Sequence, residues 1–219
     1  MKKALSLLSV VAIVAAGSTA FAASIVNSKH DLASTNTSYT QYKASNTDQT
    51  CVFCHTPHNS KETRALWNRI AGSASTTFKL YTSGAIAEAD NWFASGDKEV
   101  MAPGSSSLLC MTCHDGVTTM SALQNPPLTT AADNNDPISG AANLGTDLTN
   151  DHPINIKYSM ANTANNAGFV DAPDTTKVAL INGDYVECAS CHNVHDPAEV
   201  PFLRSSNASS ALCVACHVK

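Results

Sequence analysis

The sequence contains few large hydrophobic side chains. Leu, Ile, Val and Phe together number 43 among 219 residues, and aromatic residues make up 6%. Eight of the 43 lie within residues 1–22, so the other 197 residues hold 35, close to 18%. A chain with so little bulky apolar material buries too little surface to offset the entropy lost on ordering it. We therefore expect the fold to depend on a hydrophobic group that is not part of the polypeptide.

Long hydrophobic runs are also lacking. The one apolar stretch, residues 4–16, follows a basic start (Met-Lys-Lys, 1–3) and precedes a small-x-small sequence (Ala-Phe-Ala, 20–22). This pattern predicts a signal peptide over 1–22, and the stretch is too short to span a bilayer comfortably. We expect the mature chain, 23–219, to be exported to the cell surface or the extracellular space and to lack a membrane span. The periplasm is the alternative location.

Positive charge is scarce. The chain has 13 Lys and Arg against 18 Asp and Glu, a formal charge of −5. Residues 1–22 hold two lysines and no acidic residue, so the mature part has 11 basic against 18 acidic residues, or −7. This balance argues against nucleic acid and anionic membrane surfaces as partners, and it favours cationic or metal partners.

Cysteine occurs only inside one repeated motif, Cys-x-x-Cys-His. We call residues 51–55 motif 1, 110–114 motif 2, 188–192 motif 3 and 213–217 motif 4. In this attachment pattern of c-type haem, two thiols bond to the porphyrin edge and the adjoining histidine reaches the iron. The sequence therefore predicts four covalent haem c groups and a role in electron transfer. The predicted attachment residues are Cys51, Cys54, Cys110, Cys113, Cys188, Cys191, Cys213 and Cys216.

Two other uses of cysteine pairs are possible in principle. A Cys-x-x-Cys pair can form a zinc knuckle or a disulfide, and two pairs can form a zinc ribbon. Neither use requires a histidine directly after the second cysteine, yet all four pairs have one. The repeated histidine favours haem attachment over both alternatives.

The histidine inventory predicts the iron ligands. The motif histidines are His55, His114, His192 and His217, and the four others are His30, His58, His152 and His195. Each iron needs a second axial ligand, and imidazole suits iron well. Methionine is the competing ligand, but the methionines show no supporting pattern. Four spare histidines for four irons predict bis-histidine, low-potential haems with no open position, so we do not expect an enzyme.

Chain order suggests which spare histidine serves which haem. His195 fits haem 4, because only two residues follow His217, while His30 fits haem 1 and His152 fits haem 2. His58 and His195 each lie three residues beyond a motif histidine, so in a helical turn they would share its side and serve another haem. This leaves His58 for haem 3, either within the chain or in another copy.

The motif spacing bears on the fold class. Successive motifs begin 59, 78 and 25 residues apart, which excludes a solenoid with a fixed repeat. Residues 61–70 read as a short amphipathic helix, and residues 125–174 are rich in turn-forming residues. We expect one tetrahaem domain over 23–219, a multihaem c-type cytochrome fold of loops and short α-helices around a row of four haems, with little or no β-structure.

Three stretches carry a resemblance to a known family. They are residues 51–58 (Cys-x-x-Cys-His-Thr-Pro-His), residues 188–195 (Cys-x-x-Cys-His-Asn-Val-His) and motif 4 close to the last residue. In these the chain resembles the extracellular tetrahaem c-type cytochromes of metal-reducing bacteria, which form conductive filaments. The resemblance implies a homopolymer in which His58 ligates haem 3 of the adjacent subunit, opposite that subunit's His192. It also implies electron delivery to extracellular acceptors such as metal oxides, with other redox cytochromes as partners.

Two other functions remain open from the sequence. A monomeric periplasmic tetrahaem electron shuttle would need the same motifs and differs only in its assembly state. A multihaem reductase would need one five-coordinate haem with a free distal face, which the histidine count disfavours.

Overall fold

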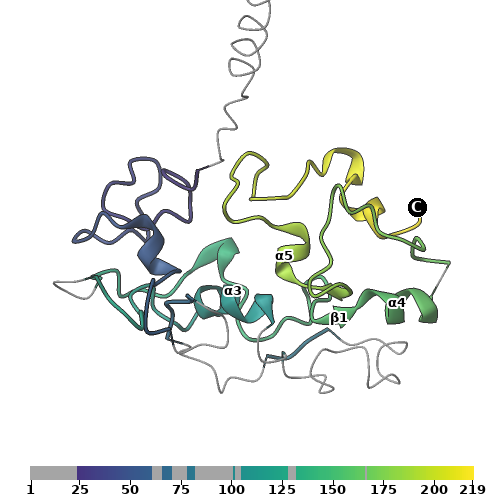
Figure 1. Ribbon diagram of the computed structural model, residues 1–219, viewed down its shortest axis with the longest axis horizontal. Helices are drawn as coiled ribbons and strands as arrows, with labels where there is room; N and C mark the ends of the chain where they lie inside the picture. The colour runs from purple at the N-terminus through teal and green to yellow at the C-terminus, as the bar shows by residue number, and fades with distance from the viewer. Residues whose placement is uncertain are drawn as a thin grey trace, which may run out of the picture.

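The polypeptide is mostly loop, with short helices and one small sheet (Figure 1). A computed structural model describes residues 24–60, 66–70, 78–81, 101, 105–127, 132–165 and 167–219. The predicted signal peptide lies outside these ranges. The elements are η1 (Thr50–Phe53), α3 (Ser106–His114), η2 (Gly140–Ala142), β1 (Ile156–Lys157), α4 (Tyr158–Ala164), β2 (Tyr185–Val186), α5 (Cys188–Cys191), η3 (Ala208–Ser210) and η4 (Cys213–Ala215), where η denotes a 3₁₀ helix. This content matches the expected short helices and little β-structure, and it is consistent with a multihaem cytochrome.

The longest described helix, α3, has nine residues and contains motif 2. It begins after Ser105, whose hydroxyl accepts a hydrogen bond from the Ser107 amide and so caps an otherwise unpaired donor. It ends before Gly116, whose φ of +70° is a left-handed conformation that glycine adopts without strain. The Asp115 carboxylate then accepts the Thr118 amide at 2.8 Å and fixes the exit turn. α3 packs against α5, and this contact brings motifs 2 and 3 together.

The sheet is a two-residue antiparallel pair between β1 and β2. Ile156 lies opposite Val186 and Lys157 lies opposite Tyr185. α4 follows β1 directly, and the hydroxyl of Tyr158 at its start lies 3.1 Å from the Cys216 carbonyl. β2 leads through one residue into α5, so the sheet ties motif 3 to the segment that supports motif 4.

Residues 66–70 form a turn and isolated β-bridges, so the helix expected over 61–70 is wrong for this half; residues 61–65 lie outside the described ranges. Leu66 has a positive φ of 67°, which breaks a right-handed helix. Its carbonyl accepts the Thr56 amide at 2.8 Å, and the Asn68 amide donates to the Cys54 carbonyl at 2.9 Å. The Ile70 amide likewise donates to the Ala122 carbonyl. Bonding to neighbouring segments on both sides therefore replaces helical bonding.

Among the described residues, the buried hydrophobic side chains form three small clusters. The first contains Phe78, Leu80, Met101, Met111, Leu148, Ile156 and Ala161; the second contains Ala44, Phe53, Leu123 and Ala132; the third contains Val178, Leu212 and Ala215. Each cluster includes one residue from inside a motif, namely Met111, Phe53 or Ala215. The scarcity of bulky side chains thus appears in the structure as separate cores, each beside a cysteine pair.

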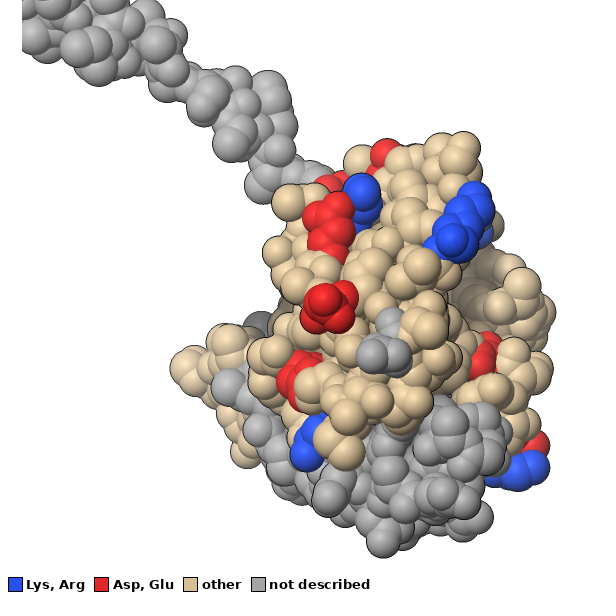
Figure 2. Space-filling model, turned by 90° about the vertical axis from the view of Figure 1, so that its right-hand side faces the viewer, with Lys and Arg blue, Asp and Glu red and all other residues tan. Residues whose placement is uncertain are grey.

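The charged side chains are dispersed. On the face shown in Figure 2, basic and acidic residues lie scattered among uncharged ones, without a broad area of one sign. No helix within the described ranges is long and apolar enough to cross a membrane.

Candidate functional site

Each motif folds into a helical turn that groups its two cysteines with its histidine. Motif 2 lies in α3, motif 3 begins as α5, and motifs 1 and 4 run through η1 and η4. In motifs 1, 3 and 4 the histidine amide donates to the carbonyl of the first cysteine, at 2.8 to 3.0 Å. The same four-residue closure belongs to α3, which contains all of motif 2. Four segments that are far apart in sequence therefore adopt one local geometry.

The residue before the second cysteine is buried in every motif. Phe53, Thr112, Ser190 and Ala215 are exposed by only 1%, 9%, 2% and 2% of their surface. The cysteines of the same turns are half-buried or exposed. Each turn is therefore anchored in the protein by this residue.

The eight cysteines are free thiols, so the disulfide alternative is not what the structure contains. Burial raises the pKa of Cys54 to about 12 and that of Cys216 to about 11, which keeps both protonated near neutral pH. No three His, Cys, Asp or Glu side chains come together as a metal-binding group within the described ranges. Free thiols are what covalent attachment to a porphyrin edge requires.

Six of the eight histidines lie in pairs. The ring centroids are 6.2 Å apart for His30 and His114, 6.1 Å for His55 and His195, and 6.3 Å for His152 and His217. When one metal ion is held between two imidazoles, each donor nitrogen lies about 2 Å from the metal and each ring centre roughly 1 Å further out, which places the centroids about 6 Å apart. Each pair joins one motif histidine to one spare histidine, so the residues present fit bis-histidine haem c.

The protonation and orientation of these rings also suit metal binding. Burial, with a smaller contribution from neighbouring histidines, lowers the pKa of His30 to about 4. Burial likewise lowers the pKa of His55 and of His152. The neutral imidazole is the form that binds a metal. In His114 the Nδ1 atom donates to the Ala142 carbonyl at 2.7 Å, which leaves Nε2 for a metal.

The ring pairs differ from the pairings expected from chain order for three histidines. His30 lies against His114 of motif 2 and not against motif 1, while His152 lies against His217 of motif 4 and not against motif 2. His195 lies against a different motif's histidine, as expected, but this is His55 and not His217. The cause is folding between distant segments, for example the contact of His30 with Phe202 at 4.4 Å between ring centroids.

Two histidines remain without a ring partner in the described structure, His192 of motif 3 and His58. The Nδ1 atom of His192 donates to the Pro201 carbonyl at 3.0 Å, so its Nε2 is again the atom left for a metal. His58 is exposed. The assignment of His58 to haem 3 stays a prediction.

The loop that carries His58 is held by its backbone. The Thr56 hydroxyl donates to the His58 carbonyl at 2.7 Å, and the Asn125 side chain donates to the same carbonyl at 3.2 Å. The Asn125 amide is bound in turn by the Asn68 side chain at 2.8 Å, and Asn68 is completely buried. An exposed imidazole on a fixed backbone is suited to donation outside the chain.

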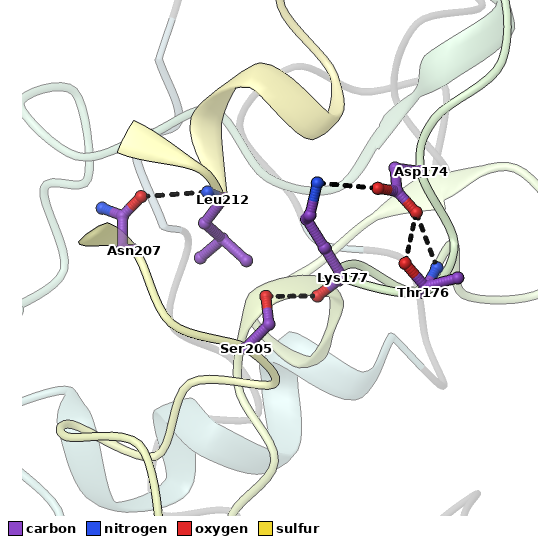
Figure 3. Close-up of polar contacts among 6 residues, drawn as sticks. All are labelled: Asp174, Thr176, Lys177, Ser205, Asn207 and Leu212. Atoms are coloured by element: carbon purple, nitrogen blue, oxygen red, sulfur yellow. Dashed lines mark hydrogen bonds and ion pairs between the residues drawn. The ribbon is translucent and has the colours of Figure 1, made fainter. Parts of the chain in front are cut away.

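Polar contacts around motif 4 hold its turn in place (Figure 3). The Asp174 carboxylate accepts from Lys177 at 2.8 Å and from Thr176, while the Asp174 amide donates to the Ala215 carbonyl inside the motif. Asn207 accepts the Leu212 amide at 3.1 Å just before Cys213. Lysine and threonine bonding lowers the pKa of Asp174 to about 2.

Among the buried charged residues beside the motifs that sequence reasoning missed are Glu187 and Arg69. Glu187, 3% exposed, precedes motif 3 and accepts hydrogen bonds from the hydroxyls of Ser105 and Ser107 at the start of α3. Arg69, 1% exposed, extends its guanidinium to the end of α3. The Glu187–Ser190 capping box was visible as a sequence pattern. Nothing in the local sequence marks Arg69 as buried.

Comparison with known proteins identifies part of this arrangement. Residues 181–219, which contain motifs 3 and 4, match a family described as "Doubled CXXCH motif". No curated protein matches the chain. The match covers the C-terminal part alone, and a doubled motif of this kind points to a multihaem c-type cytochrome.

Proposed function

We propose that the protein conducts electrons through four covalently attached bis-histidine haems, as the protomer of an extracellular filament. The observation that carries this proposal is the set of three imidazole pairs at metal-bridging distance together with one unpaired motif histidine. The doubled Cys-x-x-Cys-His match supports haem attachment and electron transfer, and such cytochromes are typically carriers and not enzymes. Bound haem supplies the redox centre, since its iron accepts and releases one electron.

The residues that would hold the haems follow from the pairs. Motif 1 with His195, motif 2 with His30 and motif 4 with His152 each supply two thiols and two imidazoles from within the chain. Motif 3 supplies two thiols and His192, and its second imidazole would be His58 from the adjacent copy. Every spare histidine is then used once, and every iron has two imidazole ligands.

The polymer is supported by the place of His58. Because this side chain is exposed and its backbone is fixed, little conformational entropy is lost when it binds a neighbour. One metal–ligand bond per interface suits a chain in which Leu, Ile, Val and Phe make up only about 18% of residues 23–219. The resemblance to filament-forming cytochromes and the acidic charge favour an exported conduit that passes electrons to extracellular acceptors such as metal oxides.

The test is substitution of His58. Relative to haem-loaded wild type, His58→Ala should keep four haems per chain, show one high-spin haem in four, and form no filaments in electron micrographs. Added imidazole should restore the low-spin spectrum but not the filaments, which separates ligation from bridging. The control Pro57→Ala changes an exposed neighbour in the same loop and should behave as wild type.

Two outcomes would contradict the proposal. Normal filaments from His58→Ala would exclude the bond between subunits. Wild-type protein that remains a single chain at high concentration would favour the monomeric periplasmic shuttle.

A further inference from the structure

Arg69 is a buried cation whose hydrogen-bond acceptors are all neutral. Its guanidinium donates to the carbonyls of Thr112 at 2.9 Å, Thr119 at 2.7 Å and Met120. All three acceptors are neutral, and no carboxylate forms an ion pair with Arg69 in the described part of the chain. The Nε–H group is buried and has no hydrogen-bond partner there.

Arg69 lies between motifs 1 and 2. Its own segment is bonded to motif 1, since the Asn68 amide donates to the Cys54 carbonyl and Trp67 pairs with His55. Its side chain reaches into motif 2, since Thr112 directly precedes Cys113. The positive charge of Arg69 is therefore held near the second cysteine of motif 1, Cys54, and the second cysteine of motif 2, Cys113.

The charge acts on both thiols. Burial raises the pKa of Cys54 and of Cys113, and Arg69 opposes that rise at each of them. The buried carboxylate of Asp115 acts in the other direction at Cys113, but less strongly than Arg69, and it is not among the charges that act on Cys54. Arg69 is therefore a fixed positive charge close enough to act on both attachment points.

A buried guanidinium with only neutral partners is costly, because it loses its hydration without gaining a counter-charge. The same isolation makes its field strong, since water and salt screen it little. A fixed positive charge stabilises a nearby centre more after that centre has gained an electron. A protein sets the reduction potential of a haem in part through burial and local charge, and Arg69 can act through both.

We propose that Arg69 is a positioning charge that raises the reduction potentials of the haems at motifs 1 and 2 above those they would otherwise have. Electrons would then occupy these two haems more than they would without the charge. The proposal depends on haem attachment at these two motifs, and it is independent of polymerisation.

The test is a potentiometric titration of haem-loaded protein, followed by visible absorption and fitted as four one-electron steps. In Arg69→Gln, the midpoint potentials of two steps should fall by at least about 59 mV each, which is about a tenfold drop in the equilibrium constant for reduction. The midpoint potentials of the other two steps should not change. The control is Arg204→Gln. Arg204 is exposed, donates to a single carbonyl at 2.7 Å and acts on Cys191 of motif 3, so solvent should screen its charge and leave all four steps unchanged.

A second variant serves if Arg69→Gln does not fold. Arg69→Lys retains a positive charge at low pH and loses it as pH rises, because burial lowers the pKa of a lysine. The midpoint potentials of its two affected steps should equal those of wild type at low pH. As pH rises, they should fall by more than the wild-type potentials do. Haem content and the low-spin spectrum, measured on every variant, report separately on the proposed function. Equal shifts in Arg69→Gln and Arg69→Lys at low pH, or unmoved steps in a fully loaded Arg69→Gln, would overturn the proposal.

Discussion

Asn68 offers a sharp test of how the polar interior supports the loop of His58. Its side chain is fully buried and donates to the carbonyls of Val52 at 2.6 Å and Asn125 at 2.9 Å. Its amide oxygen accepts the Asn125 amide at 2.8 Å. Asn68→Ala would remove all three bonds and leave three backbone groups without partners.

The expected loss follows from these three bonds. Each contributes about 1 kcal/mol net when its partners are otherwise unpaired, so Asn68→Ala should lower the free energy of unfolding by about 3 kcal/mol. Asn68→Asp keeps the acceptor but turns a carboxylate toward two carbonyl oxygens. Burial raises the pKa of that carboxyl, so this variant should be least stable above its raised pKa and should recover as pH falls and a proton allows it to donate.

Guanidinium denaturation of haem-loaded protein, followed by far-UV circular dichroism at pH 7 and pH 5, measures both effects. Asn143→Ala is the control, because Asn143 is exposed and accepts one local bond from Gly145. It should change stability by less than about 0.5 kcal/mol. A loss for Asn68→Ala as small as that of the control would refute the reasoning. It would also be refuted if Asn68→Asp became more stable, relative to wild type, when the pH is raised from 5 to 7.

Three further predictions concern the cores, the acid side of the stability profile and the cofactor. Phe53→Ala, at a side chain 1% exposed, should cost about 3–5 kcal/mol in the same assay, whereas Val117→Ala, at 65% exposure, should cost under about 0.5 kcal/mol; equal costs would contradict the cluster assignment. The pKa of Asp174 is about 2 when folded, below the roughly 3.9 of an unfolded chain, so its contribution is complete above about pH 4 and is lost as pH falls through 2. Asp174→Asn should thus be slightly less stable than wild type at neutral pH, with the difference vanishing toward pH 2, and a difference that grows in acid would count against this. Finally, protein produced without haem attachment should show no cooperative unfolding by circular dichroism, because three small clusters are too little core; a sharp transition would show that the polypeptide folds alone.

The sequence predicts the ligand-bearing residues better than their partners. Haem attachment requires two thiols and an adjoining histidine at one spacing, so covalent chemistry marks these residues in the chain itself. The partner of each histidine depends on loops with no periodic pattern, and His30 meets both His114 and Phe202, which are far from it in sequence. Residues 66–70 show the same limit, since their apolar spacing fits a helix but their backbone bonds to Cys54 and Ala122 on neighbouring segments. Arg69 could not be found from the sequence, because its burial depends on three carbonyls more than 40 positions away.

The most direct test of the central claim is a density map of purified, haem-loaded protein that resolves all four irons. It should show three irons between imidazoles of one chain, paired as His55 with His195, His114 with His30 and His217 with His152. The fourth should lie between His192 and the His58 of a neighbouring copy. A methionine or an open position at any iron, or His58 free in a solitary particle, would contradict it.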